Sequence, residues 1–481
     1  MKLPISELRN FEIAFADTCQ IHLKIPKSQN QPLTSDIKKS DIRDIPNTRH
    51  NLHCMKKLMA TGLLTAATFF SFAQDINTII NAKEVERIEK TLSSNEMQGR
   101  NAFTPAIDKA ADFIAAEFRT IGLQTWNNGN SYRQEFTMVT PKFVSTSAVL
   151  DGAPVGNKSV IVVSSQASLK INEQSGFEKV YIRPGGNLFQ EAYRYVGKEK
   201  NYLVIVDSSF SKNFNRLSGF KRNLFTSPYS TIFILTPTDP SKYEVEATHE
   251  ITETKLANVV GILPGKSKAA EFVVFSGHYD HLGIGKPENG DSIYNGANDD
   301  AAGTTAVIML AKYFKALGNN ERTLVFAAFT AEEEGGFGSQ YFSKQFDPAK
   351  VMAMFNIEMI GTESKWGKNS AYITGYEKTD MGKILEKNLQ GTPFKFYADP
   401  YTAEQLFYRS DNATLARQGV PAHTISTSKM DNEPNYHKAS DEIQTLDMEN
   451  MAMIIKAIAK SSGTIVSGKD SPTRVNTADL R

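Results

Sequence analysis

The chain has 481 residues, of which 40% are hydrophobic and 22% are charged; this is ordinary for a globular protein and excludes disordered and fibrous classes. Lysine and arginine total 54, against 53 aspartate and glutamate. Part of the cationic excess lies within the first 57 residues, so no basic face is predicted and nucleic acid is not an expected partner.

The N-terminal region has the pattern of a signal peptide. Met55-Lys56-Lys57 precedes an uncharged apolar run, LMATGLLTAATFFSFA, which ends with small residues at Ser71 and Ala73. A charged start, an apolar centre and a small-x-small end predict a signal peptide over 55–73, and the run is shorter than the roughly 20 residues of a membrane span. We therefore expect an exported protein, periplasmic or extracellular, with no membrane span in the mature chain.

Residues 1–54 are then interpreted as an upstream extension outside the fold. The alternative is that the apolar run is a buried helix behind a genuine N-terminal domain. Both cysteines, Cys19 and Cys54, precede the predicted cleavage site. The mature chain would have no disulfide and would depend on its core, and perhaps on metal, for stability.

Two regions with different sequence patterns follow the predicted cleavage site. In residues 74–135, the stretch AIDKAADFIAAEFRTIGL repeats apolar residues at helical spacing, which predicts a helical N-terminal part of the domain that follows the insert. Its predicted buried face contains Ala106, Ala110, Ile114 and Phe118. The next residues, 136–255, contain short β-rich runs such as KSVIVVSS, NYLVIVDSS and STIFILTP, which predict an inserted β-rich subdomain.

Residues 256–465 alternate between apolar strands and helices. The predicted strands are NVVGILP, FVVFSG, TLVFAAFT, AMFNIEM, AYITG and AHTIST, and the helices are TTAVIMLAKYFKAL, DMGKILEKNL and NMAMIIKAIAKS. This alternation predicts an α/β domain with a mainly parallel central sheet and helices on both faces. The polar tail, residues 466–481, is a candidate for disorder from about Ser467.

Polar side chains recur where the apolar strands end. Ligands of open α/β sheets bind beyond the carboxyl ends of the strands, so these positions are candidates for a site. They are His278, Asp280 and His281 after FVVFSG; Asn298, Asp299 and Asp300 before a helix; Glu332, Glu333 and Glu334 after TLVFAAFT; Glu358 after AMFNI; and Tyr436 and His437 after AHTISTS.

Imidazole nitrogens and carboxylate oxygens are favoured zinc ligands. Two histidines and three carboxylates on successive strand ends could hold two zinc ions, and Asp299 is the candidate to bridge them, because its two oxygens can each bind one ion. Three anionic ligands against two divalent ions leave one positive charge, which a shared hydroxide would cancel.

The adjacent glutamates need different roles, because neighbouring side chains at a strand end point in different directions. One would bind metal, and the other would accept the proton of metal-bound water and deliver it to the leaving amine. Spacing alone allows Glu332 as base with Glu333 as ligand, or the reverse.

Each motif also has an ordinary structural interpretation. Asp299 or Asp300 could cap the helix that begins near Ala301. Glu332 to Glu334 could form a solvated turn, and either histidine alone would be an unremarkable polar residue. Only their joint placement favours metal.

At these residues the sequence resembles the zinc aminopeptidase and glutamate carboxypeptidase family, which includes bacterial leucyl aminopeptidases. The matching stretches occur in the family's order over about residues 256–460, with a weaker similarity in NEMQGRNAFTPAIDKAADFIAAEF. They are NVVGILPG, SGHYDHLG, NGANDDAAGTTAV, AAFTAEEEGGFGSQYF, NIEMIG, YRSDNATLARQGVPA and YHKASDE. Several motifs in order are specific, whereas any one would be weak.

The resemblance implies a site of two Zn²⁺. One ion is held by His278 and Glu358 and the other by Glu333 and His437, while Asp299 bridges them. Glu332 is implied as the general base. Asp280, Asp300 and Asp441 are expected to support the ligands without binding metal, Asp280 by orienting His278.

The resemblance further implies a cis peptide bond between Asp299 and Asp300. It also exposes two departures from the family pattern. Glu358 stands where most members have aspartate, which lengthens that ligand by one methylene. Asn412 stands where histidine is usual, so a histidine near the substrate pocket is expected to be lost.

The resemblance implies a peptide substrate and an aminopeptidase in which a metal-bridging hydroxide attacks with Glu332 as base. A glutamate-type carboxypeptidase is an alternative, but it would need a cationic clamp, for which Arg409 is the nearby candidate. A glutaminyl cyclase would use one zinc. A receptor-like binding protein on the same fold would need no base beside a metal.

The first testable prediction concerns processing. The mature protein should begin at Gln74, because the small residues at positions 71 and 73 fit a signal peptidase. Intact-mass analysis of the exported protein measures this end directly. Recovery of an exported species that retains residues 1–54 would contradict the prediction and favour an N-terminal domain.

Overall fold

The computed structural model describes residues 75–480. The predicted signal peptide, 55–73, and the upstream extension, 1–54, lie outside the described residues. Within 75–480, no helix is long and apolar enough to cross a membrane. The α-helices are α2 (Ile76–Ile79), α3 (Ala82–Leu92), α4 (Ala106–Ile121), α5 (Leu188–Tyr193), α6 (Ala302–Leu317), α7 (Phe337–Ser343), α8 (Met381–Asn388), α9 (Asn412–Ala416), α10 (Met448–Ser461) and α11 (Gly463–Val466).

The N-terminal helices follow from local signals. The Asn81 side chain accepts a hydrogen bond from the Glu84 amide and caps α3, and α4 ends at Gly122 in the left-handed conformation. The predicted apolar face of α4 is confirmed, because Ala106, Ala110, Ile114 and Phe118 are all buried. This face packs into the main core.

The largest sheet has the strand order β17-β16-β18-β15-β11-β14-β10-β2-β3. Its strands are β2 (Arg133–Leu150), β3 (Ala153–Val155), β10 (Tyr243–Leu263), β11 (Lys268–His278), β14 (Arg322–Phe329), β15 (Val351–Ile357), β16 (Ser370–Ile373), β17 (Lys395–Ala398) and β18 (Ala422–Ser426), with β1 (Gln124–Thr125), β5 (Ser168–Asn172) and β8 (Leu224–Phe225) off this path. The central strands β18, β15, β11 and β14 are parallel, whereas β10 and β2 pair antiparallel. The α/β class is therefore confirmed, with a sheet that is parallel at its centre and mixed overall.

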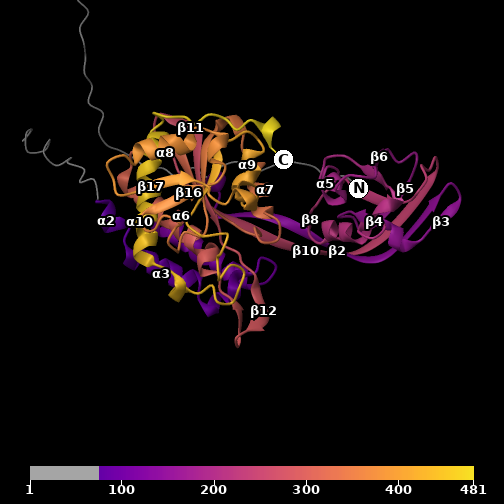
Figure 1. Cartoon of the computed structure of the whole chain (residues 1–481), viewed down its shortest axis with the longest axis horizontal. Coiled ribbons are helices and arrows are strands. Elements are labelled where there is room, and N and C mark those ends of the chain that lie inside the picture. The colour runs from indigo at the N-terminus through magenta and orange to yellow at the C-terminus, as the bar shows by residue number, and fades with distance from the viewer. Residues whose placement is uncertain (1–74, 481) are drawn as a thin grey trace, which may run out of the picture. The chain divides into compact units, whose positions relative to one another are not determined.

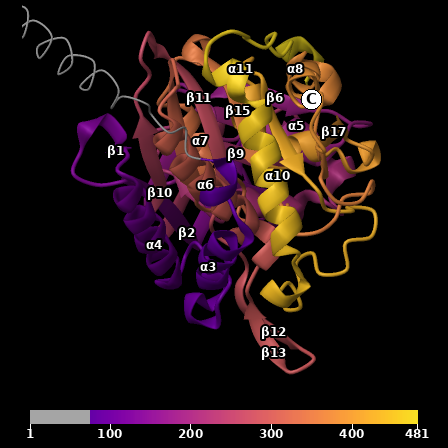
Figure 2. The same cartoon turned by 90° about the vertical axis from the view of Figure 1, so that its left-hand side faces the viewer.

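Helices cover both faces of this sheet because alternate strand residues point to opposite sides. In β11, Val273 and Phe275 pack into the core formed with α3, α4, α6 and α10, while Val274 packs into the core that includes residues of α7 and α9. Phe275 stacks on Phe326 and Phe355 of the neighbouring strands. Figure 1 shows the helices around the sheet, and in Figure 2 α3, α4 and α10 lie toward the viewer.

The inserted region contains its own four-stranded sheet, of order β4-β9-β7-β6. Its strands are β4 (Val160–Val163), β6 (Glu178–Ile182), β7 (Tyr202–Val206) and β9 (Thr231–Leu235), so the three apolar runs expected as strands are strands. The predicted boundaries at 136 and 255 fall inside β2 and β10. The chain therefore enters and leaves the insert along two continuous strands.

The C-terminal tail, a candidate for disorder, instead packs on the part of the chain that contains the central sheet. Val475 is buried, and its amide donates to the carbonyl of Gly419. Arg474 donates to the carbonyls of Val351 and Pro348. Apolar periodicity could not predict this attachment, because it depends on backbone carbonyls far away in the sequence.

Candidate metal centre

The predicted site residues lie at the carboxyl ends of the central parallel strands. His278 is the last residue of β11, and Glu358 directly follows β15. Glu332 and Glu333 follow β14, and Asp299 lies in η6 (Ala297–Ala301), the irregular turn that enters α6. His437 comes from the loop after β18. Parallel pairing of these neighbouring strands thus brings the five predicted ligands to one edge of the sheet.

The two oxygens of Asp299 face two different histidines. Oδ1 lies 3.2 Å from Nε2 of His278, and Oδ2 lies 3.4 Å from Nε2 of His437. The second oxygen of Glu333 is 3.2 Å from the same His437 nitrogen. Ligands at 2.0–2.1 Å from a tetrahedral zinc are about 3.3–3.4 Å apart, so these pairs have the separation of ligands sharing an ion.

The buried atoms at the site also fit metal ions. His278 Nε2, Glu333 Oε1 and Glu358 Oε2 have no hydrogen-bond partner within residues 75–480. Burying such groups unpaired is costly, and a cation would satisfy all three. His278, Asp299 and Glu358 form one group whose ligand atoms lie within 4.8 Å of one another. The donor set of imidazole and carboxylate is the one zinc prefers.

His281 is the site residue whose role sequence reasoning missed. Its side chain is fully buried, and its Nδ1 lies 2.8 Å from Oε1 of Glu333. It forms a second candidate group with Asp299 and Glu333. Because 2.8 Å is closer than two ligands of one zinc ion lie, His437 fits a ligand position better than His281 does. The sequence does indicate that His281 could belong to the site, because it lies three residues after His278 at the same strand end.

Asp280 supports the site differently from the prediction. Its carboxylate is 3.7 Å from Nδ1 of His278, which instead contacts the backbone carbonyl of Asp280 at 3.1 Å. The carboxylate accepts hydrogen bonds from the amides of Glu332, at 3.1 Å, and Glu333, at 3.3 Å. The reason is the turn after β11, which directs the Asp280 side chain toward the neighbouring strand end.

Asp300 and Asp441 likewise hold the backbone of the ligand segments. Asp300 accepts from the amide of His278 at 3.1 Å and from that of Met359 at 3.1 Å. It also accepts from the Gly303 amide, so the helix-capping interpretation holds for Asp300. Asp441 accepts from the amides of Asn298 and Asp299. The Asp299–Asp300 peptide bond is cis, as the resemblance implied.

The crowding of carboxylates changes their proton affinities. Burial raises the pKa of Glu358 to about 7, and the charge of Asp299 adds to the effect. Burial also raises the pKa of Glu332 well above its usual range, with Glu358 contributing. Burial alone would lower the pKa of His437, but the Asp299 and Glu333 carboxylates raise it to about 10. Without metal, these groups therefore hold protons near neutral pH.

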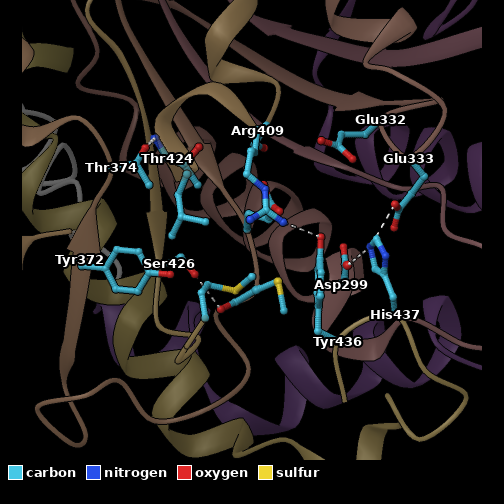
Figure 3. A pocket seen from close by; sticks show the side chains of 15 residues that line it. Asp299, Glu332, Glu333, Tyr372, Thr374, Arg409, Thr424, Ser426, Tyr436 and His437 are labelled. Atoms are coloured by element: carbon cyan, nitrogen blue, oxygen red, sulfur yellow. Dashed lines mark hydrogen bonds and ion pairs between the residues drawn. The ribbon is translucent and has the colours of Figure 1, made fainter. Parts of the chain in front are cut away.

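A pocket opens beside the candidate metal centre. In Figure 3, Glu332, Glu333, Asp299 and His437 lie to one side, and the guanidinium of Arg409 points toward the hydroxyl of Tyr436. Tyr372, Thr374, Thr424 and Ser426 lie on the other side in Figure 3, and Met359, Leu406 and Met430 also line the pocket; none of these side chains is charged. The His437 side chain is 37% exposed, so the site opens on the His437 side.

The fold and the site together define an α/β protein with a candidate metal centre at the carboxyl edge of its sheet. Residues 258–462 match the model of peptidase family M28. The chain is 28% identical over 204 residues to a probable leucine aminopeptidase of Trichophyton verrucosum, covering 40% of this chain and 53% of the relative. It is 29% identical over 211 residues to leucine aminopeptidase 1 of Ajellomyces dermatitidis, covering 40% and 52%.

The match of residues 258–462 to the family M28 model confirms the resemblance of this part of the chain to the zinc aminopeptidase family. The chain spans about half the length of the curated relatives it matches. Among solved structures, it is similar to an aminopeptidase from Aneurinibacillus sp. strain AM-1 with a TM-score of 0.48 and 15% identity, over 85% of this chain and 98% of the other.

The second prediction concerns zinc affinity and pH. Zinc must displace protons from Glu358 below about pH 7 and from His437 up to about pH 10, so affinity should fall as pH falls and fall more steeply below pH 7. Zinc titration calorimetry at pH 6, 7 and 8, each in two buffers of different ionisation enthalpy, measures affinity and protons released. An affinity that does not change between pH 6 and pH 8 would contradict this ligand set.

Proposed function

We propose that the protein is an exported aminopeptidase that binds two zinc ions and removes N-terminal residues from peptides. The observation that carries the proposal is the position of Asp299 between two histidines, with separations of 3.2 and 3.4 Å. His278 and Glu358 would hold one ion, and Glu333 and His437 the other. When bound, the ions would polarise the scissile carbonyl and acidify a water molecule.

Glu332 supplies the proton-transfer group. It lines the pocket beside Glu333, and its backbone amide is fixed by Asp280. Burial raises the pKa of Glu332, so its carboxylate is a stronger base than that of an exposed glutamate, as a group that takes a proton from water and later protonates a leaving amine must be. Glu333 differs, because its oxygens lie within 3.2 Å of His281 and His437.

The pocket supports a neutral side chain at the substrate N-terminus. Leu406, Met430 and Tyr372 offer apolar surface, and the hydroxyl groups that line the pocket are uncharged. The acidic edge of the pocket attracts the free α-amine of a peptide. The names of the relatives, leucine aminopeptidases, agree with such a pocket.

One observation favours the carboxypeptidase alternative: Arg409 lines the pocket. Its guanidinium already lies 3.2 Å from the Glu404 carboxylate and 3.4 Å from the Tyr436 hydroxyl. A clamp for a terminal carboxylate would have to compete with Glu404. The cyclase and receptor alternatives predict one zinc and no zinc per chain, whereas the peptidase binds two.

Export is the remaining part of the proposal. It rests on the signal-peptide pattern of residues 55–73. An exported, disulfide-free protein fits a site in which metal ions connect several strand ends.

The third prediction concerns whether the protein cleaves peptides from the amino end or from the carboxyl end. Aminoacyl-nitroanilides with free amines should be hydrolysed, with leucine and methionine preferred over aspartate, because Leu406, Met430 and Tyr372 give the pocket apolar surface and its metal-binding edge is acidic. The N-acetylated forms of the same compounds are the matched control and should resist cleavage. Cleavage of N-acylated peptides from their carboxyl ends would contradict the proposal and favour the carboxypeptidase.

The fourth prediction separates the two glutamates. Glu332→Gln keeps the size of the side chain but removes the proton acceptor, so zinc should stay bound while kcat falls by roughly 10²–10⁴-fold. Glu333→Gln should instead weaken zinc binding, and added zinc should partly restore its activity. A zinc titration of kcat for both variants is the measurement. Rescue of the 332 variant but not the 333 variant would reverse the two roles.

A further inference from the structure

Arg100 is a fully buried cation behind the candidate metal centre. Of the lysine and arginine side chains in residues 75–480, it is one of two that are buried, and the other is Arg322. All of its hydrogen bonds within this part of the chain go to backbone carbonyls and none to a carboxylate. Nε donates to Tyr279 O at 2.8 Å, Nη1 donates to Leu92 O and Asn295 O at 2.6 Å each, and Nη2 donates to Gly296 O at 2.9 Å.

Three of these four carbonyls, those of Tyr279, Asn295 and Gly296, belong to the two loops that carry proposed ligands, and the fourth is that of Leu92 at the end of α3. Tyr279 directly follows His278, and Gly296 lies three residues before Asp299. The carbonyl of Arg100 also accepts a hydrogen bond from the His281 amide at 3.2 Å. One side chain and its own backbone thus connect the end of β11 to the turn that enters α6.

The neighbouring residue shows how closely this segment approaches the loops. A Cβ atom on Gly99 would lie 2.5 Å from the carbonyl oxygen of Tyr294 and 2.6 Å from that of Gly283. Gly99 also has a φ of 66°, which glycine adopts without strain. The segment therefore fits between the two loops only with glycine at position 99.

The charge of Arg100 acts on the same site. The carboxylates that influence it electrostatically are Glu89, Asp280, Asp441 and Asp299. A guanidinium that bonds only to carbonyls keeps its charge available to these neighbours, because no single carboxylate neutralises it. In a low-dielectric interior such a charge acts over several ångströms.

We propose that Arg100 is a positioning residue for the metal centre: it holds the His278 and Asp299 loops together before metal binds, and its charge offsets the crowded carboxylates. The inference rests on the proposed metal site. Groups that orient metal ligands typically contribute 10–100-fold to metal affinity. Arg100 should contribute within that range although it touches no ligand side chain.

The test compares Arg100→Met and Arg100→Lys with the unchanged protein. Zinc alone, as zinc sulfate, is titrated into metal-free protein in competition with a chromophoric chelator, and folding is checked by circular dichroism. Arg100→Met should bind zinc 10–100-fold more weakly, and Arg100→Lys, which keeps the charge, should lose less. Wild-type affinity in folded Arg100 variants would overturn the proposal.

Arg322→Lys is the matched control. Arg322 is also buried and donates to two backbone carbonyls, those of Ile465 and Asp470, but it begins β14, at the opposite end of the strand from Glu332 and Glu333. The control should lower the melting temperature and leave zinc affinity unchanged. If it weakens zinc binding as much as Arg100→Met does, the effect is general destabilisation and the proposal fails.

Hydrogen exchange of the unchanged protein decides the question if the Arg100 variants do not fold. In the metal-free protein, peptides covering 278–283 and 294–298 should be protected, whereas the peptide covering 430–438 should gain protection only with zinc. Equal exchange of all three without metal would overturn the proposal. Zinc content of the unchanged protein tests the metal site separately, so a chain that binds no zinc refutes the proposed function itself.

Discussion

The burial of negative charge at the carboxyl edge of the sheet is the constraint that shapes this protein. A carboxylate removed from water is costly unless it is paired or hydrogen-bonded, and several close together repel one another. The structure stabilises these buried carboxylates in two ways. Backbone amides satisfy Asp280, Asp300 and Asp441. Glu333 Oε1 and Glu358 Oε2 accept no hydrogen bond within the described residues, and both glutamates belong to candidate metal-binding groups that share Asp299.

This division gives each carboxylate one role. Asp280, Asp300 and Asp441 each accept hydrogen bonds from amides of other segments that carry site residues, so they connect these segments to one another. Asp299 has its own amide held by Asp441, and its carboxylate is free to face His278 and His437. The two neighbouring aspartates therefore have different roles. Asp299 faces the candidate metal centre, and Asp300 fixes the backbone around it.

The sequence predicted the features that depend on local order along the chain. Strand ends in an α/β pattern identify His278, Glu333 and Glu358, because parallel strands place their carboxyl ends at one edge. The position of Arg100 and the contact of His281 with Glu333 could not be predicted in this way. The partners of Arg100 are backbone carbonyls up to 196 residues away, and a carbonyl has no residue type that a motif can reveal. The contact of His281 with Glu333 depends on the turn geometry after β11.

Asn412 stands where the family usually has histidine, and the structure shows that this position acts on the substrate pocket indirectly. Asn412 is fully buried and does not line the pocket; its Nδ2 donates to the carbonyl of Phe407, and its Oδ1 accepts from the Thr424 hydroxyl. Leu406 and Arg409, on either side of Phe407, and Thr424 itself do line the pocket. Asparagine at 412 therefore acts on the substrate pocket through the segments that form its wall, by fixing their backbone and a hydroxyl rotamer. A histidine there would have to replace both an amide donor and an acceptor within a space that already holds Ala422, so the pocket wall and residue 412 constrain each other.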